Sequence, residues 1–202
     1  MEIKNLVLGF LGVNCYLIST EKAAIVIDPG FKSPEAEEFL TENSHKERLI
    51  LLTHSHFDHI GGAELLRNKT HTEIAIGEVE GPDLLNRELL EYFHAHFEPF
   101  SADILLRDNE IIKVGDLEIK VIFTPGHTRG GVSYYINDTL FSGDTLFFES
   151  VGRTDFPGGD ADTLTRSVKQ LYADFPDNTP VLPGHGEATT IGHEKMCNPY
   201  VR

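Results

Sequence analysis

Apolar residues gather along the chain in short runs separated by turn-forming residues, a pattern typical of β-strands. Gly12-Val13-Asn14 separates the first two runs, which predicts a hairpin, and Asn137-Asp138 joins a later pair in the same way. Asp28-Pro29-Gly30 ends the third run as a tight turn. The pattern predicts strands over residues 2–9, 14–20, 23–27, 48–52, 72–76, 105–113, 117–123, 132–136, 139–141 and 179–182.

Helical segments are interspersed with these strands. Ser33 is a favourable N-cap, Pro34 takes the first helical position and acids fill the first turn, so a helix is expected from here to about Asn43. Further helices are expected over 61–68 and 160–172, near Thr190, and as Glu-rich pieces around Pro82 within 78–97. Because this order of strands and helices occurs twice, we expect an α/β (α+β) fold with two sheets packed face to face and helices outside.

The stretch Thr53-His54-Ser55-His56-Phe57-Asp58-His59 directly follows an apolar run and precedes Gly61-Gly62. It therefore lies at the carboxyl end of a buried strand, where ligand sites gather in α/β proteins. A helix would direct the three histidines and the aspartate to different faces, so we place the stretch on a loop that turns them inward. Imidazole nitrogens with a carboxylate oxygen suit zinc, iron or manganese. The alternative is a polar turn with stray histidines, and the density of ligand residues argues against it.

Three more candidate ligands each follow a predicted strand within a glycine-containing turn. They are His127 in Thr124-Pro125-Gly126-His127-Thr128, Asp144 in Ser142-Gly143-Asp144-Thr145, and His185 in Pro183-Gly184-His185-Gly186. Small residues let the backbone bend sharply and bring each side chain toward a shared centre. One such residue alone is more often a turn or capping residue, but four stretches of this kind together indicate one site.

These stretches supply seven candidate metal ligands, namely His54, His56, Asp58, His59, His127, Asp144 and His185. One tetrahedral zinc takes three or four protein ligands, so seven suit two divalent ions about 3.5–4 Å apart with shared oxygen ligands. Asp144 is the expected bridge, and zinc is the first choice of metal, with iron or manganese as alternatives. The other histidines are expected at the surface or in packing, with pocket lining as an alternative for two of them, His94 and His96.

Composition and charge narrow the class of protein. A length of 202 residues with 40% hydrophobic and 24% charged content suits one soluble domain over residues 1–202. The net charge of −15 argues against an extended nucleic-acid surface, which needs a basic face. Neither a membrane-spanning run nor a secretory signal is evident, and the two cysteines, Cys15 and Cys197, form no CxxC pair. We therefore expect a cytoplasmic protein without nucleic-acid or membrane partners.

The pattern His54-x-His56-x-Asp58-His59, followed by His127, Asp144 and His185, resembles the metallo-β-lactamase superfamily over nearly the whole chain. The resemblance implies a four-layer αβ/βα sandwich with metals at one edge between the two sheets. It also implies a ligand split, in which one ion is held by His54, His56 and His127, the other by Asp58, His59 and His185, and Asp144 bridges them.

Within the superfamily the chain looks most similar to glyoxalase II (hydroxyacylglutathione hydrolase) and its short bacterial relatives, through Gly152-Arg153-Thr154-Asp155-Phe156 and residues 189–194. Asp144 fits this branch, since true β-lactamases typically carry cysteine or histidine there, and antibiotic hydrolysis is not expected. Full-length glyoxalase II adds a C-terminal helical domain that contacts glutathione, and little chain follows His185 here, so we expect a domain without it. Arg153 matches a basic family position and is a candidate substrate anchor, with an ion pair to Asp155 as the alternative.

The resemblance implies hydrolysis of a small thioester, such as S-lactoylglutathione to lactate and glutathione, by attack of a metal-bound hydroxide. Asp58 is the expected catalytic residue, because it orients the nucleophile while binding metal. Asp28 is expected to fix a ligand histidine through a hydrogen bond, although it is also the first residue of a turn.

Three rival functions stay open at this stage. Persulfide dioxygenases share the motif and use one iron, held by counterparts of His54 or His56, His127 and Asp144. A phosphodiesterase or nuclease of the same fold is disfavoured by the acidic composition. A non-catalytic, metal-stabilised binding module is disfavoured because structural sites are closed and need fewer ligands.

Overall fold

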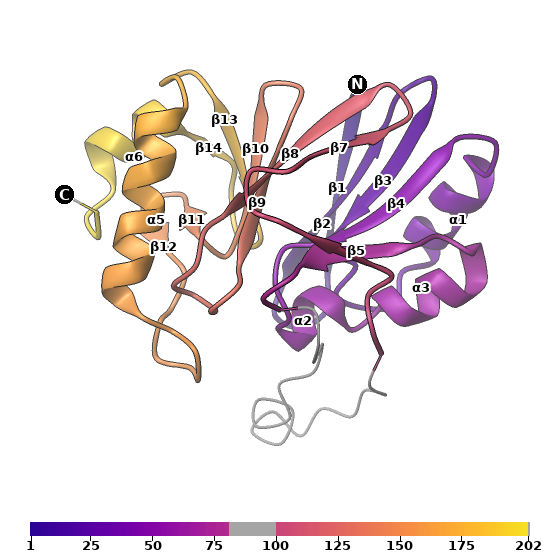
Figure 1. Ribbon diagram of the computed structural model, residues 1–202, viewed down its shortest axis with the longest axis horizontal. Helices are drawn as coiled ribbons and strands as arrows, with labels where there is room; N and C mark the ends of the chain where they lie inside the picture. The colour runs from indigo at the N-terminus through magenta and orange to yellow at the C-terminus, as the bar shows by residue number, and fades with distance from the viewer. Residues whose placement is uncertain (81–99, 202) are drawn as a thin grey trace.

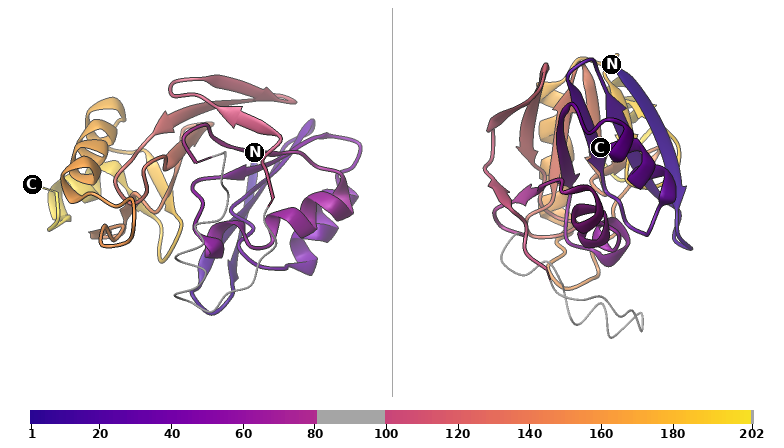
Figure 2. Two further views of the ribbon diagram at one scale, coloured as in Figure 1. Left: turned by 60° about the horizontal axis from the view of Figure 1, so that its bottom comes forward. Right: turned by 90° about the vertical axis from the view of Figure 1, so that its right-hand side faces the viewer.

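The computed structural model describes residues 1–80 and 100–201. Two six-stranded sheets pack face to face, with helices on the outer surface of each, as Figure 1 and Figure 2 show. These are the two packed sheets with outer helices that the order of elements predicts, and the four-layer sandwich that the resemblance implies, so the expected fold class is confirmed. No helix within the described ranges is long and apolar enough to cross a membrane.

The first sheet keeps its strands in chain order, as β1 (Glu2–Leu8), β2 (Val13–Ser19), β3 (Ala23–Ile27), β4 (Glu47–Leu52), β5 (Ile74–Gly77) and β6 (Ile104–Leu106). The pairs β1–β2 and β2–β3 are antiparallel, as expected for hairpins, whereas β3 to β6 run parallel. Parallel neighbours need crossover helices, and α1 (Pro34–Glu42) and α3 (Ala63–Thr70) supply two of them. The single-turn helix α2 (Phe57–Ile60) lies between β4 and α3.

The second sheet has the order β14-β13-β10-β9-β8-β7. Its strands are β7 (Ile111–Val114), β8 (Leu117–Phe123), β9 (Val132–Ile136), β10 (Thr139–Gly143), β13 (Pro180–Pro183) and β14 (Thr189–Thr190). Helices α5 (Ala161–Asp174) and α6 (Ile191–Cys197) lie on the same side of the molecule as β13 and β14 in Figure 1. A small separate hairpin is formed by β11 (Leu146–Phe147) and β12 (Ser150–Val151).

The central strands β3, β4 and β5 of the first sheet carry continuous apolar runs because both of their faces are buried. In β4, Leu49 and Leu51 face the core between the two sheets, while Ile50 and Leu52 face the helices α1 and α3. Side chains alternate between the faces of a strand, so a strand buried on both sides needs apolar residues at every position. A third cluster joins the second sheet to α5 and α6.

The helix starts follow the predicted capping chemistry. The Ser33 hydroxyl accepts a hydrogen bond from the backbone N–H of Ala36, and Pro34 begins α1. Asp160 caps α5 in the same way by accepting from the N–H of Thr163. Such a cap contributes about 1 kcal/mol to helix stability. The cap residue also marks the start of each of these two helices in the sequence.

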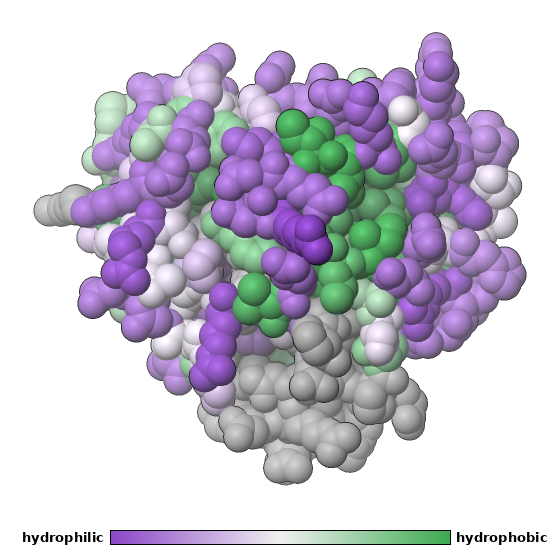
Figure 3. All heavy atoms as spheres, viewed as in Figure 1, coloured by the Kyte–Doolittle hydropathy of each residue, from purple (hydrophilic) through white to green (hydrophobic). Residues whose placement is uncertain are grey.

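One predicted strand is wrong. Residues 105–113 form two strands, β6 and β7, that belong to different sheets. The chain turns at Asn109, which has a positive φ of 59°, and Asp108 accepts a hydrogen bond from the N–H of Phe123. Leu105 and Ile111, on either side of this turn, are both exposed. Figure 3 shows that apolar side chains also gather near the centre of the face turned toward the viewer.

Other differences from the predictions are small. Helix α3 begins at Ala63 rather than at residue 61, and the short strands β11, β12 and β14 have no counterpart among the predicted elements. Strands of two residues are too short to show a periodic pattern. Of the predicted helical segment 78–97, residues 81–97 lie outside the described residues, and these include His94 and His96.

The topology brings the candidate ligands to one edge. Strands β3 and β4 are parallel, so Asp28 and the stretch from Thr53 follow strand ends at the same edge of the first sheet. In the second sheet, β8 and β10 both run antiparallel to β9 and therefore parallel to each other, and β13 is parallel to β10. The turns with His127, Asp144 and His185 thus also lie at one edge.

Candidate metal centre

The stretch after β4 is part loop and part helix. His54 and Ser55 lie in a loop and His56 is the N-cap of α2, whereas Asp58 and His59 are inside this single helical turn. The expectation that all four ligand residues lie on a loop is therefore wrong for Asp58 and His59. Of the four ligand residues, only Asp58 and His59 are inside the helix. Neighbouring helical residues differ by about 100° in direction, which is small enough for both side chains to reach the centre.

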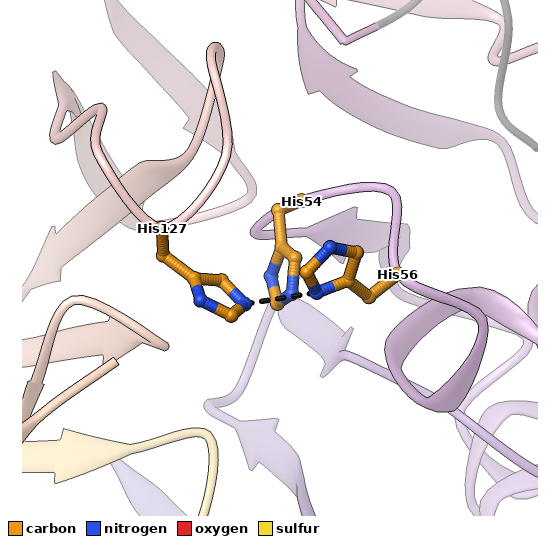
Figure 4. A group of neighbouring side chains, drawn as sticks. All are labelled: His54, His56 and His127. Atoms are coloured by element: carbon orange, nitrogen blue, oxygen red, sulfur yellow. Dashed lines mark hydrogen bonds between the residues drawn. The ribbon is translucent and has the colours of Figure 1, made fainter. Parts of the chain in front are cut away.

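The first ligand group consists of His54, His56 and His127, whose rings converge as Figure 4 shows. The Nε2 atom of His127 lies 2.8 Å from Nδ1 of His56. The Nε2 atom of His54 is buried and has no hydrogen-bond partner within the described part of the chain. A buried nitrogen without a partner is costly unless something binds it, so this atom fits a metal ligand.

The second group consists of Asp58, His59 and His185. The Nε2 atoms of His59 and His185 lie 3.2 Å apart, and Oδ2 of Asp58 lies 3.2 Å from Nε2 of His185 and 3.8 Å from Nε2 of His59. Ligands about 2.1 Å from a tetrahedral ion are about 3.4 Å from one another. These spacings therefore suit one ion.

Asp144 lies between the two groups. Its Oδ1 is 3.3 Å from Nε2 of His59, and its Oδ2 is 3.5 Å from Nε2 of His127 and 3.6 Å from Nε2 of His185. One carboxylate thus reaches a histidine of each group, as a bridging ligand must. The structure brings all seven predicted residues together, and their binding of metal stays a prediction from this geometry.

Hydrogen bonds on the outer side of two histidines fix their tautomers. Nδ1 of His127 donates to the backbone carbonyl of Arg153 at 2.7 Å, and Nδ1 of His59 donates to Oδ2 of Asp28 at 2.8 Å. A carbonyl or carboxylate oxygen can only accept, so each ring carries a proton on Nδ1 and turns its Nε2 toward the centre. This is the arrangement that metal-binding histidines usually have.

Asp28 also controls His54 through Thr53. The Thr53 hydroxyl donates to Oδ2 of Asp28 at 2.7 Å, and the Thr53 N–H donates to Oδ1 at 2.8 Å. Because the single hydroxyl proton goes to Asp28, the Thr53 oxygen accepts from Nδ1 of His54, 3.1 Å away. The buried carboxylate of Asp28 therefore orients one histidine of each ligand group, which extends the role expected for it.

The charges around the centre also fit a bound cation. Burial and the neighbouring imidazoles hold the pKa of His54 well below its usual range, and burial lowers the pKa of His56 to about 3. Both rings are therefore neutral near pH 7, the form that binds metal. For His59, burial acts to lower the pKa, but Asp144, Asp28 and Asp58 outweigh it and raise the pKa well above the usual value. Three carboxylates around the His59 ring create a negative potential that favours binding of a cation.

Sequence reasoning missed two residues that hold this centre together. Thr53 stands at the head of the motif, but only the structure shows its link between Asp28 and His54. Glu80 is buried and accepts hydrogen bonds from the hydroxyl of Ser55 and from the N–H of Gly130 at 2.9 Å. It thereby ties the loop of His54 and His56 to the loop after His127. No periodic or spacing signal marks Glu80, because its partners are distant in sequence.

Glycine is required where the two ligand turns approach each other. A Cβ on Gly184 would lie 2.2 Å from Oδ1 of Asp144 and 2.7 Å from Cε1 of His59. We expect Gly184→Ala to displace these ligands and to lower both metal content and activity by about 10-fold or more, since misplacing the residues that support ligands already costs this much. Elemental analysis and turnover of the purified variant measure the effect.

Gly186 is the matched control in the same turn. It has a φ of +77°, and no described atom lies within 4 Å of a Cβ built on it. Gly186→Ala should lose about 1 kcal/mol of stability, because a side chain disfavours this conformation, yet keep its metal. If Gly184→Ala keeps full metal content as well, the close packing of the two turns does not position the ligands.

A cavity of about 410 Å³ opens over the centre. Ligand residues form its floor, and mostly apolar residues form its wall, namely Leu11, Phe57, Phe147, Ser150, Val151, Arg153 and Phe156. Arg153 makes two hydrogen bonds to Asp155, at 2.7 and 2.6 Å, and its guanidinium lies 3.7 Å from the ring centre of Phe156. The structure therefore shows the ion pair with Asp155, while Arg153 still borders the cavity.

Comparison with known sequences gives concordant matches. The family model described as the Metallo-beta-lactamase superfamily matches residues 8–185. The probable metallo-hydrolase YqgX of Bacillus subtilis is 32% identical over 208 residues, which cover 100% of this chain and 98% of YqgX. The hydroxyacylglutathione hydrolase GloC of Haemophilus influenzae is 35% identical over 197 residues, which cover 93% of this chain and 92% of GloC.

Solved structures agree with these sequence matches. BLEG-1, described as a B3 metallo-beta-lactamase, superposes with a TM-score of 0.85 at 35% identity over 99% of both chains. ETHE1 from Myxococcus xanthus gives a TM-score of 0.81 at 30% identity, over 98% of this chain and 84% of its own. TTHA1623 in a di-iron-bound form gives 0.81 at 31% identity, over 98% of this chain and 100% of its own. By fold, candidate ligand set and sequence, this chain belongs to the metallo-β-lactamase superfamily of metal-dependent enzymes.

Proposed function

We propose that this protein is a dinuclear metal-dependent hydrolase that acts on a small thioester, S-lactoylglutathione or a close analogue. The observation that carries the proposal is the position of Asp144, whose two oxygens face histidines of both ligand groups. A single ion needs neither seven ligands nor a shared carboxylate. The match to GloC, named a hydroxyacylglutathione hydrolase, supports the thioester class.

The residues would divide between two ions as the geometry groups them. His54, His56 and His127 would hold one ion, Asp58, His59 and His185 the other, and Asp144 would serve both. Two such ions, when bound, polarise the substrate carbonyl and lower the pKa of water between them. The donor set contains nitrogen and oxygen but no sulfur, which suits zinc, iron or manganese.

Asp58 has the position of a residue that orients the attacking water. It borders the cavity, and its Oδ2 contacts Nε2 of His185 at 3.2 Å. Burial acts to raise its pKa, but His59 and His185 outweigh this and hold the pKa below the usual range. The side chain is therefore an ionised acceptor at neutral pH, able to receive a hydrogen bond from water and direct its oxygen toward the cavity.

The mostly apolar cavity wall suits the acyl thioester part of a substrate. Phe147 packs edge-on to His185 with ring centres 6.3 Å apart, and Phe156 packs similarly on His56 at 6.0 Å. Aromatic walls beside the ligands exclude water and hold the apolar part of a substrate. A thiolate leaves without a strong general acid, and this fits a wall that is mostly apolar.

A panel of substrates on one metal-loaded sample tests the proposal. We expect release of free thiol from S-lactoylglutathione, little oxygen uptake with glutathione persulfide, and little ring opening of a β-lactam. The similarity to ETHE1 makes persulfide oxidation the second candidate, and the similarity to BLEG-1 makes the β-lactam a necessary comparison. Oxygen uptake without thioester hydrolysis, or faster turnover of the β-lactam, would refute the thioester proposal.

Arg153 should contribute little to binding of the glutathione part. Its guanidinium is already paired with Asp155, and both side chains are exposed. An ion pair between the exposed Arg153 and a carboxylate of the substrate would also be weak and screened by salt. Arg153→Met should therefore raise KM for S-lactoylglutathione by less than about 3-fold. A neutral thioester measured in parallel is the control. A rise of KM well beyond this for the anionic substrate alone would identify Arg153 as the anion anchor.

A further inference from the structure

A second group of metal-ligand residues lies on the surface beside helix α6, and it shares no residue with the centre described above. Glu149, in the turn between β11 and β12, meets His193 and Cys197 of α6. One ligand atom from each of the three residues lies within 4.8 Å of the others. We propose that these three side chains form a separate site for a thiophilic divalent cation such as Zn²⁺ or Cd²⁺.

The spacing along the helix favours chelation. His193 and Cys197 are four residues apart, so their side chains emerge on the same face, one turn from each other. Nε2 of His193 already lies 3.0 Å from Oε1 of Glu149. Glu149 and Cys197 are exposed and His193 is half-buried, so small rotations about side-chain bonds can bring all three donors onto one ion.

The backbone that carries Glu149 is held against the same helix. Glu194 of α6 is fully buried, and its carboxylate accepts hydrogen bonds from the backbone N–H of Glu149 at 3.1 and 3.0 Å. The same carboxylate accepts from the hydroxyl of Thr189 at 2.6 Å and from Nδ2 of Asn198 at 2.8 Å. A donor on an anchored turn loses less freedom when it binds, so the three ligands are partly preorganised.

Packing also holds His193 in position. Its ring stacks on Phe148, with ring centres 5.0 Å apart and planes 13° from parallel. Glu149 itself lies in the turn between β11 and β12 and has a positive φ of 50°. The ligand from the turn and the two from the helix therefore come from elements with fixed relative positions.

The donor set identifies the class of ion. A thiol sulfur, an imidazole nitrogen and a carboxylate oxygen form the mixed set that zinc and cadmium accept, with water in a fourth position. Binding replaces the thiol proton of Cys197, which is released to solvent, and no oxidation is involved. Hard ions such as Mg²⁺ or Ca²⁺ prefer all-oxygen sites and should compete poorly.

Occupancy of this site would stiffen one side of the cavity. The hairpin that carries Glu149 also supplies Phe147, Ser150 and Val151 to the cavity wall. An ion held by Glu149 and by α6 would link this hairpin to the helix more firmly than the hydrogen bonds to Glu194 alone. The site would therefore act on the shape of the cavity without touching the reacting atoms.

Titration of the zinc-loaded protein with Cd²⁺ tests the proposal. A cadmium–thiolate bond gives an ultraviolet charge-transfer band, and the proposed dinuclear centre contains no thiol. Cys15 is buried and stays in every variant. We expect one saturable cadmium–thiolate site per chain in the natural protein and none in Cys197→Ala. Glu149→Gln and His193→Ala should bind at least about 10-fold more weakly, the smaller of the losses seen when residues around a metal are removed.

Met196→Ala is the matched control, because Met196 is 82% exposed on the same helix and should bind like the natural protein. Absence of the band in the natural protein would overturn the proposal. So would a band of equal affinity in Glu149→Gln and His193→Ala, which would show binding by an exposed thiol alone. Thioester turnover of Cys197→Ala is read separately, so failure here leaves the proposed function untouched.

Discussion

Replacing Asp144 with alanine is expected to reduce the bound metal from about two ions per chain to one or fewer and to lower kcat by about 10³-fold or more. The reason is geometric, since the Asp144 oxygens face His59, His127 and His185 at 3.3 to 3.6 Å. Burial opposes its ionisation, but the surrounding histidines outweigh this and hold its pKa below the usual range, so the carboxylate is charged at neutral pH. No other described residue reaches both ligand groups with two oxygens.

Elemental analysis and initial rates on the same preparation measure this effect. Asp144→Asn is the companion variant, because it keeps the volume of the side chain and removes its charge. Asp162→Asn, on the exposed first turn of α5, is the control for loss of one acidic residue. Full metal content and full activity in Asp144→Ala would remove the bridging role and, with it, the dinuclear proposal.

Asp28→Asn should have the next largest effect, a loss of about 10- to 100-fold in metal affinity or activity, the range found for groups that orient metal ligands. Asp28 accepts hydrogen bonds from Nδ1 of His59 and from Thr53, which in turn accepts from Nδ1 of His54. An amide has one acceptor oxygen, so its nitrogen replaces either Oδ1, which accepts from the N–H of Thr53, or Oδ2, which accepts from His59 and from the Thr53 hydroxyl. At least one of these bonds is lost, and in the second orientation one histidine of each group loses its fixed tautomer. The buried donor left without a partner also costs about 1–3 kcal/mol of stability.

Thr53→Val separates the two branches of this network. It removes the hydroxyl between Asp28 and His54 but leaves the bond from His59 to Asp28. We expect its effect on metal affinity to be smaller than that of Asp28→Asn, as measured by competition with a chelator. Equal metal affinity in Asp28→Asn and the natural protein would show that the Asp28 contacts serve the fold alone.

Most of the fold follows from local signals in the sequence. The apolar run of β4 is buried on both faces, so its hydrophobic pattern predicts the strand. Ser33 and Asp160 cap α1 and α5, so cap residues at these positions indicate where the two helices begin. The seven candidate ligands can also be predicted from the sequence, because each of the four stretches that carry them directly follows an apolar strand. Parallel topology then brings those turns together.

The parts that were missed depend on contacts between distant segments. The split of residues 105–113 arises because β6 pairs with β5 and β7 with β8, with a turn in the polar residues 107–110 between them. Helix α2 is too short to show a period. Glu80 binds Ser55 and Gly130 across the structure, and no sequence spacing encodes that.

Metal content per chain, measured by elemental analysis on Cys197→Ala purified without added metal, tests the dinuclear centre most directly. This variant removes the contribution expected from the surface group of Glu149, His193 and Cys197. The seven-ligand geometry predicts about two zinc, iron or manganese ions per chain, with hydrolysis of S-lactoylglutathione by the same sample. One iron per chain with no hydrolysis, and with oxygen uptake on glutathione persulfide, would contradict the dinuclear hydrolase.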